Sequence, residues 1–101
     1  LGRKDALQYA ERAHRLAPAS PAVIDTLGWI SLETGNPARA LPLLQKAVGL
    51  APAAAETRYH LAATLAKSGD KLSARKELEK LLADKKPFAQ ADEARALLKL
   101  L

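Results

Sequence analysis

Glu56 and His60 are the residues whose types and spacing come closest to a catalytic pair. They lie four residues apart, so on a helix both side chains would share one face and could act as acid and base. No nucleophile or metal-binding cluster accompanies them, and an ion pair on the helix surface is the interpretation we favour. His14 is the only other histidine and lies in no motif. The sequence therefore predicts a protein that is not an enzyme.

The sequence also lacks the patterns that hold metals and cofactors. Cysteine is absent, which excludes disulfides and thiol chemistry within these residues. Zinc would need clusters of cysteine and histidine or the pattern HExxH, and neither occurs. A glycine-rich loop that could surround a phosphate is missing too. We therefore expect no cofactor, no metal and no small-molecule substrate.

The composition favours a single domain of packed helices. The chain has 101 residues, of which 49% are hydrophobic and only 4% aromatic, so aliphatic residues must form the core. Such residues suit close-packed helices better than a β-sandwich. No apolar run approaches the roughly 20 residues that a membrane-spanning helix needs. Methionine is absent and the sequence starts at Leu1, which we interpret as a piece of a longer protein.

The formal net charge of +5 raises nucleic-acid binding as an alternative function. Basic residues gather between positions 67 and 86, but acidic residues are interleaved with them, which favours an ordinary solvated helix face. Repeat proteins that read RNA carry base-reading polar residues at recurring positions, and no such recurrence is seen. Nucleic acid is therefore not the favoured partner. The basic residues are Lys67, Lys71, Arg75, Lys76, Lys80, Lys85 and Lys86, and the acidic ones are Asp70, Glu77, Glu79 and Asp84.

Small and apolar residues recur along the chain at a constant spacing of 34 positions. Independent matches at one offset are rare in a random chain, and a period of about 34 is that of a helix–turn–helix repeat. A generic helical bundle is the alternative, but bundles show heptads rather than a sustained long period. The matched positions are Pro18 and Pro52; Ala6, Ala40 and Ala74; Leu27 and Leu61; Gly35 and Gly69; Ala13, Ala47 and Leu81; and Ala10, Leu44 and Leu78.

These residues resemble the tetratricopeptide repeat family. Ser31 departs from the pattern, because an aromatic residue is usual there. The resemblance implies an all-α fold, a right-handed superhelix of antiparallel helix pairs with about six helices in one domain. The expected units are the second helix of a partial repeat (1–18), two full repeats (21–52 and 55–86) and a C-terminal capping helix (87–101). The matching residues are Ile24, Leu27, Gly28, Ala40, Leu44, Ala47 and Pro52, followed by Leu61, Ala62, Leu65, Ala74, Leu78 and Leu81.

Glycines and capping residues predict where the helices end. Ser20, Asn36 and Asp70 can each cap the helix that follows. Gly35 and Gly69 fit the tight turns inside each unit. We expect the six helices to run over about 3–16, from Pro21 to near Gly35, from Pro37, over about 54–67, from 71 to near Asp84, and from Pro87 onward.

Pro42 conflicts with this scheme. It lies about six residues past the Asn36 cap, where proline removes one backbone hydrogen bond and crowds a carbonyl. The sequence therefore predicts a loosened or kinked first turn in the third helix.

The first and last helices are expected to differ in what they cover. The apolar stripe of Ala91, Ala94, Leu97, Leu98 and Leu101 predicts that the last helix covers the final repeat. The first helix lacks a partner helix within the chain. Its face of Leu7, Ala10 and Ala13 is therefore expected to be partly bare, and we predict self-association through it.

The family resemblance implies that a peptide or protein binds on the concave surface formed by the first helices of the repeats. Trp29 and Tyr59 could each present a flat ring to such a peptide, although packing between neighbouring helices is an equally weighted alternative. A clamp for a terminal carboxylate is not expected, since Asp25 and Trp29 stand where its lysine and asparagine would be. A structural cap with an unused groove is the other alternative. The expected concave positions are Ala22, Asp25, Trp29, Leu32 and Glu33, and then Glu56, Tyr59, Ala63, Ala66 and Lys67.

Three further strings suggest a narrower resemblance. DTLGWI (25–30), RYHLA (58–62) and EARALLKLL (93–101) are similar to the C-terminal end of the tetratricopeptide lipoproteins of bacterial PEP-CTERM systems. This resemblance implies a large extracytoplasmic protein of Gram-negative bacteria, linked to exopolysaccharide production and surface-protein sorting. A periplasmic or outer-membrane-anchored location would follow from it.

Overall fold

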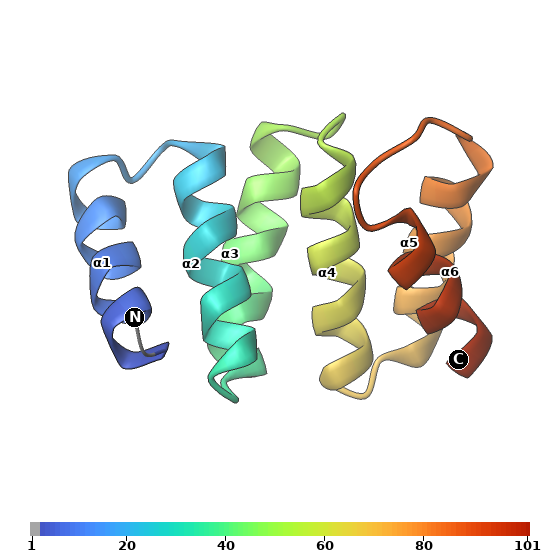
Figure 1. Ribbon diagram of the computed structural model, residues 1–101, viewed down its shortest axis with the longest axis horizontal. Coiled ribbons are helices and arrows are strands. Elements are labelled where there is room, and N and C mark those ends of the chain that lie inside the picture. The colour runs from blue at the N-terminus through green and yellow to red at the C-terminus, as the bar shows by residue number, and fades with distance from the viewer. Residues whose placement is uncertain (1–2) are drawn as a thin grey trace.

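The computed structural model describes residues 3–101, and these residues form helices and connections without any strand (Figure 1). The expected all-α fold is therefore confirmed, and the first five helices begin within one residue of the predicted positions. The helices are α1 (Arg3–Leu16), α2 (Pro21–Glu33), α3 (Pro37–Leu50), α4 (Ala55–Lys67), α5 (Lys71–Ala83) and α6 (Ala91–Leu100).

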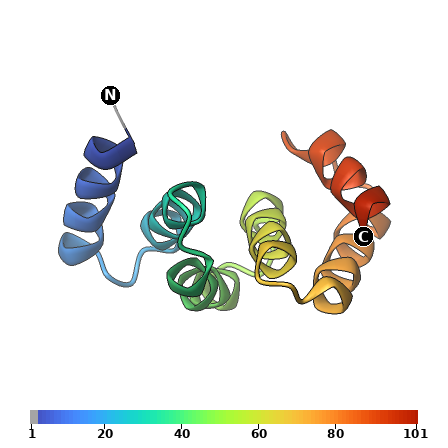
Figure 2. The same ribbon diagram turned by 90° about the horizontal axis from the view of Figure 1, so that it is seen from below.

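Successive helices are antiparallel and form two layers. Figure 2 shows α2 and α4 in one layer and α3 and α5 in the other, while α1 and α6 stand at the two ends. Both end helices project to the side on which α2 and α4 lie, so that side is concave. The extents of 35 × 24 × 22 Å describe a short array rather than a sphere. This arrangement leaves α2 and α4 as the walls of the concave side.

Two turns of the same geometry join the helices within each pair. Gly35 and Gly69 have φ angles of 87° and 90°, which glycine adopts without the steric cost that a Cβ would bring. The residue after each glycine donates its backbone N–H to the carbonyl five residues earlier, at 2.9 Å in both turns. This pattern is a Schellman motif, and it satisfies carbonyls that the helix end would otherwise leave unpaired.

Side-chain caps begin three of the helices, as the sequence predicts. The side chains of Ser20, Asn36 and Asp70 each accept a hydrogen bond from the backbone N–H three residues later, at 3.4, 3.1 and 3.1 Å. Ala54, the residue before α4, has no side chain that could do the same. The α4 amino terminus is therefore the uncapped start within the two helix pairs.

The core is built from small residues facing large aliphatic ones. A Cβ added at Gly28 would lie 2.7 Å from Cγ of Leu44, so glycine allows α2 to approach α3 closely. Ser31 is buried, and its hydroxyl donates to the Leu27 carbonyl at 2.7 Å. Where an aromatic ring is usual in the family, a small satisfied side chain keeps the helices close. The central cluster consists of Ala40, Leu44, Leu61, Leu65 and Ala74.

Pro42 does not loosen the start of α3. The helix continues through it from Pro37 to Leu50, and the Ala40 N–H donates to the Asn36 carbonyl at 3.1 Å, so the first turn is formed. The prediction of a loosened first turn is therefore wrong, and the alternative of a kinked turn stays a prediction. Pro42 is solvent-exposed, and water can therefore satisfy the carbonyl that lacks its N–H partner.

The last helix starts later than the sequence predicts. Pro87 was expected to open it, but α6 begins at Ala91 and the connection occupies residues 84–90. Phe88 explains the difference, because its ring packs against the buried cluster of Ala62, Leu78 and Ala94. The connection brings this ring inward, and the chain resumes a helix only at Ala91. As expected, α6 covers the last pair, with Ala94 fully buried.

The bare face expected on α1 is only partly found. Ala10 is buried against the rest of the chain, and Leu7 and Ala13 are half-buried. An ion pair between Glu11 and Arg39 of α3, with 2.9 Å between Oε2 and Nη2, helps to hold α1 in place. The large apolar side chains that α1 exposes are instead Tyr9 and Leu16, at 58% and 81%.

Candidate functional site

The predicted concave positions lie on α2 and α4, and we call this surface the inner wall. Asp25, Trp29, Leu32, Tyr59 and Ala63 are half-buried, while Glu33, Glu56 and Lys67 are exposed. The outer wall is the opposite surface, formed by α3 and α5. The inner wall consists of Ala22, Asp25, Trp29, Leu32, Glu33, Glu56, Tyr59, Ala63, Ala66 and Lys67.

Asp25 is the centre of a polar cluster that joins α2 to α4. Its Oδ1 lies 2.7 Å from Nδ1 of His60, and its Oδ2 accepts a hydrogen bond from the Thr57 hydroxyl at 3.0 Å. The side chains of His60 and Asp25 are only 12% and 17% exposed. His60 therefore does not form the predicted surface pair with Glu56 on its own helix. It reaches across to the neighbouring helix pair instead, because its ring points toward α2.

The aromatic side chains stack beside this cluster. The rings of Trp29 and His60 are nearly parallel, with centroids 4.2 Å apart. Tyr59 lies tilted against both, with centroids 6.1 Å from Trp29 and 5.9 Å from His60. Such contacts fix ring positions. Trp29 and Tyr59 are thus packed between neighbouring helices and also half-exposed on the inner wall.

Tyr59 lies close to α6 as well as to α2. It packs against the buried cluster of Ala62, Leu78 and Ala94, the last of which belongs to α6. Burial, and after it the negative charge of Glu93 on α6, raises the pKa of the Tyr59 hydroxyl above its ordinary value of 10.0. The hydroxyl is therefore neutral at physiological pH and can serve as a hydrogen-bond donor or acceptor.

The remaining predicted positions do not all join one site. Leu32 and Ala66 pack against the central core, which leaves less of them for a ligand. Glu33 and Lys67 are the last residues of α2 and α4, at the opposite end of the wall from Ala22 and Glu56. The predicted positions therefore lie at two ends of the inner wall, and the rings of Trp29, Tyr59 and His60 lie between them.

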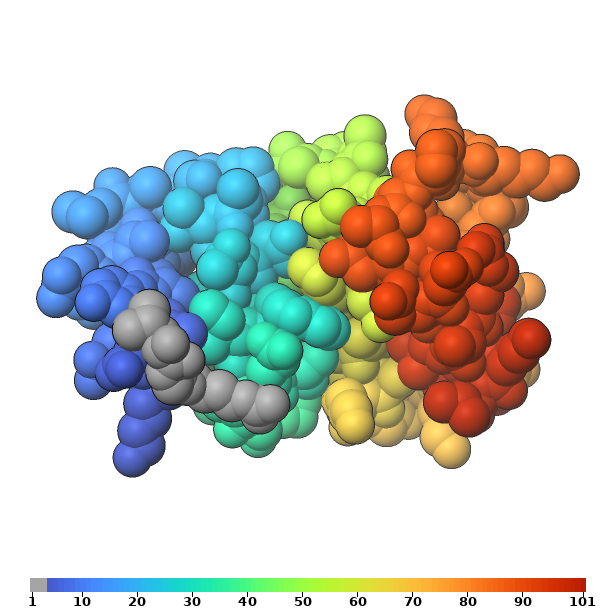
Figure 3. Space-filling view, in the orientation of Figure 1, coloured from blue at the N-terminus to red at the C-terminus, as the bar shows by residue number. Residues whose placement is uncertain are grey.

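A cleft of about 510 Å³ opens at the amino-terminal end of the inner wall. Three predicted positions, Ala22, Asp25 and Glu56, line it. Figure 3 looks onto the concave side and shows α4 at the bottom of the space between α2 and the segment 84–90. The other residues that line the cleft are Pro21, Ala51, Ala54, Ala55, Thr57, Pro87 and Phe88.

Sequence reasoning missed the part that four residues play in this region. Thr57 and His60 bind Asp25, and Pro87 and Phe88 close one side of the cleft. A signal for the second pair was present, since proline at position 87 is one residue later than the 34-residue period requires. That shift marks a longer connection. Nothing in the period indicated that the connection would reach the inner wall.

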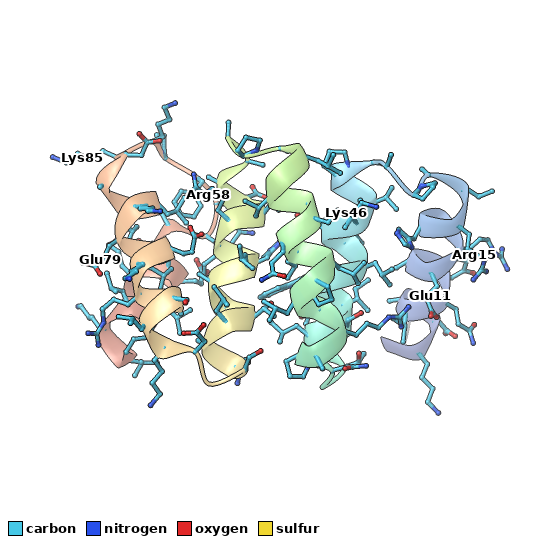
Figure 4. The ribbon with its side chains drawn as sticks, turned by 180° about the vertical axis from the view of Figure 1, so that it is seen from behind. Glu11, Arg15, Lys46, Arg58, Glu79 and Lys85 are labelled. Carbon is cyan, nitrogen blue, oxygen red and sulfur yellow. The ribbon has the colours of Figure 1, made fainter. Side chains whose placement is uncertain are left out.

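The two walls differ in charge. Helix α2 carries Asp25 and Glu33 and no basic residue, whereas α3 carries Arg39 and Lys46 and no acidic residue. Figure 4, seen from behind, looks onto the outer wall and labels Lys46 there. The basic residues of α5 that the sequence singled out are exposed: Lys71, Arg75, Lys76 and Lys80.

Neither a metal site nor a membrane span emerges from the described residues. Residues 3–101 contain no cluster of three or more histidine and acidic side chains placed to hold an ion. Over the same residues, every helix is too short or too polar to cross a bilayer.

Comparison with protein families identifies the repeat. A family model described as tetratricopeptide repeat matches residues 31–101, from the end of α2 through α6. No curated protein matches the chain significantly. The family model thus covers the second helix pair, the 84–90 connection and most of the first pair.

Proposed function

The chain belongs to the tetratricopeptide repeat family, and from this premise we propose that its inner wall binds an extended segment of a partner protein, without catalysis. Repeats of this family generally mediate protein–protein interactions. The observation that carries the proposal is the cleft of about 510 Å³, because it joins predicted positions from two successive helix pairs. A concave site shared by two rigid elements is a common place for a ligand.

The rigidity of the wall supports this proposal. Asp25 is held by two partners, and Trp29 is held by the ring of His60. Side chains already fixed in place lose little conformational entropy when a partner binds. Trp29 also retains exposed surface on the concave side, and tryptophan is among the residues that contribute most at interfaces.

A peptide-display selection against the natural chain tests the proposal. Ala22 and Ala38 are both exposed alanines at the second position of a helix, Ala22 in the cleft of the inner wall and Ala38 in α3. Ala22→Arg is expected to abolish binding of the selected peptides, and Ala38→Arg to leave it unchanged. Both variants should keep the natural melting temperature. Equal binding to both variants would contradict the proposal.

The alternative of a purely structural cap has one observation in its favour. Helix α6 seals the end of the last pair, where Ala94 is fully buried against Ala62 and Leu78. A cap of this kind needs no ligand. The same selection separates the two functions, because a cap would yield no peptide whose binding depends on Ala22.

We also propose that copies of the chain associate through α1. The support is the exposure of Tyr9 and Leu16, whose apolar side chains would be covered in such a contact. Sedimentation equilibrium of the natural chain should show a dimer or larger species at high concentration. The double variant Tyr9→Ser, Leu16→Ser should sediment as a monomer. A natural chain that is monomeric at every concentration would contradict this proposal.

A narrower function in bacterial surface-protein sorting is proposed from the strings at 25–30, 58–62 and 93–101. Their likeness to PEP-CTERM-system lipoproteins is its only support. The proposal implies a protein that lies outside the cytoplasm and is anchored by a lipid. Fractionation of cells that make the natural parent protein tests this location. Recovery in the cytoplasm, rather than with periplasm or outer membrane, would refute it.

A further inference from the structure

The inner wall is acidic in a chain that is basic overall. The net charge is +5, yet the described residues that line the cleft include Asp25 and Glu56 and no lysine or arginine. Glu93 of α6 adds a third carboxylate near this side, close enough to influence Tyr59. Negative charge that gathers at one place on a positively charged molecule indicates a partner with positive charge.

The rest of the cleft is apolar and lined by small side chains. Alanines from the α3–α4 turn and from both inner helices form its walls, and Phe88 and Pro87 form one side. Small residues leave room for a larger side chain from outside, and the volume of about 510 Å³ exceeds what a single aliphatic side chain needs. The cleft therefore suits an apolar residue together with part of its neighbours.

Two helix amino termini also lie at the cleft, and their partial positive charge would favour an anionic ligand, whereas the carboxylates would favour a cationic one. The first turns of α2 and α4 both line the cleft, and each carries roughly half a positive charge from the helix dipole. Asp25 and Glu56 bring two carboxylates to the same cleft. The carboxylates outweigh the dipoles, so a cationic ligand is favoured over an anionic one.

Asp25 can accept another hydrogen bond. Each of its oxygens has one protein partner, His60 for Oδ1 and Thr57 for Oδ2, and a carboxylate has about four acceptor positions. These two partners fix the orientation of the carboxylate. Glu56 is exposed at the rim, with no ion pair to a basic residue of the described chain within 4.0 Å. A guanidinium or ammonium group could therefore approach both.

We propose that the cleft binds a peptide segment in which an apolar residue lies beside arginine or lysine. The apolar side chain enters the alanine-lined space next to Phe88, and the cationic group binds the carboxylates of Asp25 and Glu56. This inference rests on the proposed function, since it names the chemistry of the partner at the same wall. The partner class is thus a cationic, partly apolar stretch of protein.

Three blocked synthetic peptides test the proposal. The first is Gly-Ser-Arg-Leu-Arg-Ser-Gly, the second replaces both arginines by glutamate, and the third replaces leucine by glycine. Fluorescence anisotropy at 50 and 200 mM salt measures binding to the full chain. We expect the first peptide to bind tightest and to weaken as salt rises. Equal or tighter binding of the glutamate peptide would overturn the inference and favour the helix amino termini.

Glu56→Lys and Glu79→Lys form a matched pair of charge reversals. Both glutamates are exposed, but Glu79 lies on α5, on the outer wall (Figure 4). Reversing Glu56 should weaken binding of the arginine peptide about fivefold, the scale of a lost and inverted exposed ion pair. Reversing Glu79 should change it by less than about twofold, because only long-range screened charge is altered. Equal weakening by both would show nonspecific attraction and contradict the proposed site.

Phe88 tests the apolar part separately. Phe88→Leu keeps an apolar side chain in the cluster and preserves folding, while it removes the ring that closes the cleft. In this variant, the difference in affinity between the leucine peptide and the glycine peptide should become smaller. An unchanged advantage would place the leucine elsewhere. If display yields neutral or acidic peptides that depend on Ala22, the proposed function survives and this inference fails; if no peptide depends on Ala22, both fail.

Discussion

The helix pairs α2–α3 and α4–α5 have the same backbone plan and different inner surfaces. Residues 34 positions apart repeat the turn glycines, the caps that follow them and the buried aliphatic positions. Among the positions at which the pairs differ, two lie on the inner wall: Asp25 corresponds to Tyr59, and Trp29 corresponds to Ala63. The comparison teaches that the repeated residues build the scaffold, whereas the inner-wall side chains change from one pair to the next.

The largest expected effect comes from the repeated core. Leu44 and Leu78 are equivalent positions, and both are fully buried. Leu44→Ala and Leu78→Ala should each lower the free energy of unfolding by about 2–5 kcal/mol, because each leaves a cavity in a packed core. Urea denaturation measures both. A loss below about 1 kcal/mol at either position would mean that the two pairs do not share one packing plan.

The next largest effect concerns a core position at which the two pairs differ: Gly28 in the first pair corresponds to Ala62 in the second. Gly28→Ala would place a Cβ 2.7 Å from Leu44, and the fully buried leucine has little room to move. We expect the free energy of unfolding to fall by about 1–3 kcal/mol. Gly49→Ala is the control, since nothing lies within 4 Å of its added Cβ.

In the control, helix propensity alone should raise the free energy of unfolding by up to about 1 kcal/mol. Chemical denaturation of both variants gives opposite signs if the close approach of α2 and α3 is correct. Stabilisation by both substitutions would contradict it.

A smaller effect concerns the helix caps, where the first pair has Ser20 and the second has Ala54. Both residues precede their helix in an extended conformation, with φ and ψ of −79° and 115° for Ser20 and −76° and 99° for Ala54. Ala54→Ser should therefore add the cap that Ser20 provides and stabilise the chain by about 0.5–1 kcal/mol. Ser20→Ala should destabilise it by about the same amount. Thermal melts measure both, and a destabilising Ala54→Ser would show that the two helix starts differ.

The smallest expected effect is a dependence of the free energy of unfolding on pH, which arises from Tyr59 on the inner wall. The pKa of Tyr59 is raised in the folded chain, so below pH 10 both folded and unfolded states keep the proton. As pH rises above 10, the unfolded chain loses that proton first, and the free energy of unfolding falls.

Tyr59→Phe should make this alkaline loss of stability shallower. Tyr9→Phe should leave it unchanged, because Tyr9 is exposed on α1. Denaturation at pH 9 to 11 compares the two variants with the natural chain. Identical slopes for all three would contradict the role given to burial of Tyr59.

The sequence predicts most of the scaffold because the scaffold repeats. Gly35 and Gly69 have positive φ values, and Asn36 and Asp70 are caps, as their spacing requires. These features depend on local chemistry that a short stretch of sequence already contains. The loosening predicted at Pro42 is not found, because the effect of a lost hydrogen bond depends on exposure, which a local pattern does not reveal.

The site is less predictable because it depends on contacts between pairs. Glu56 and His60 share a helix, yet His60 binds Asp25 of the other pair, 35 residues earlier. The family resemblance selected Asp25 and Glu56 but could not indicate Phe88. That residue reaches the cleft only because the 84–90 connection is longer than the four-residue connections before α2 and α4. Three-dimensional packing, rather than periodicity, determines these contacts.

Nuclear magnetic resonance mapping of the backbone amides tests the central claim most directly. The natural chain, labelled with ¹⁵N, is titrated with the Gly-Ser-Arg-Leu-Arg-Ser-Gly peptide. We predict that the largest shift changes fall in the first turns of α2 and α4 and in the 84–90 connection, with α3 and α5 nearly unchanged. Changes concentrated on α3 and α5, or spread evenly over all six helices, would contradict binding at the inner wall.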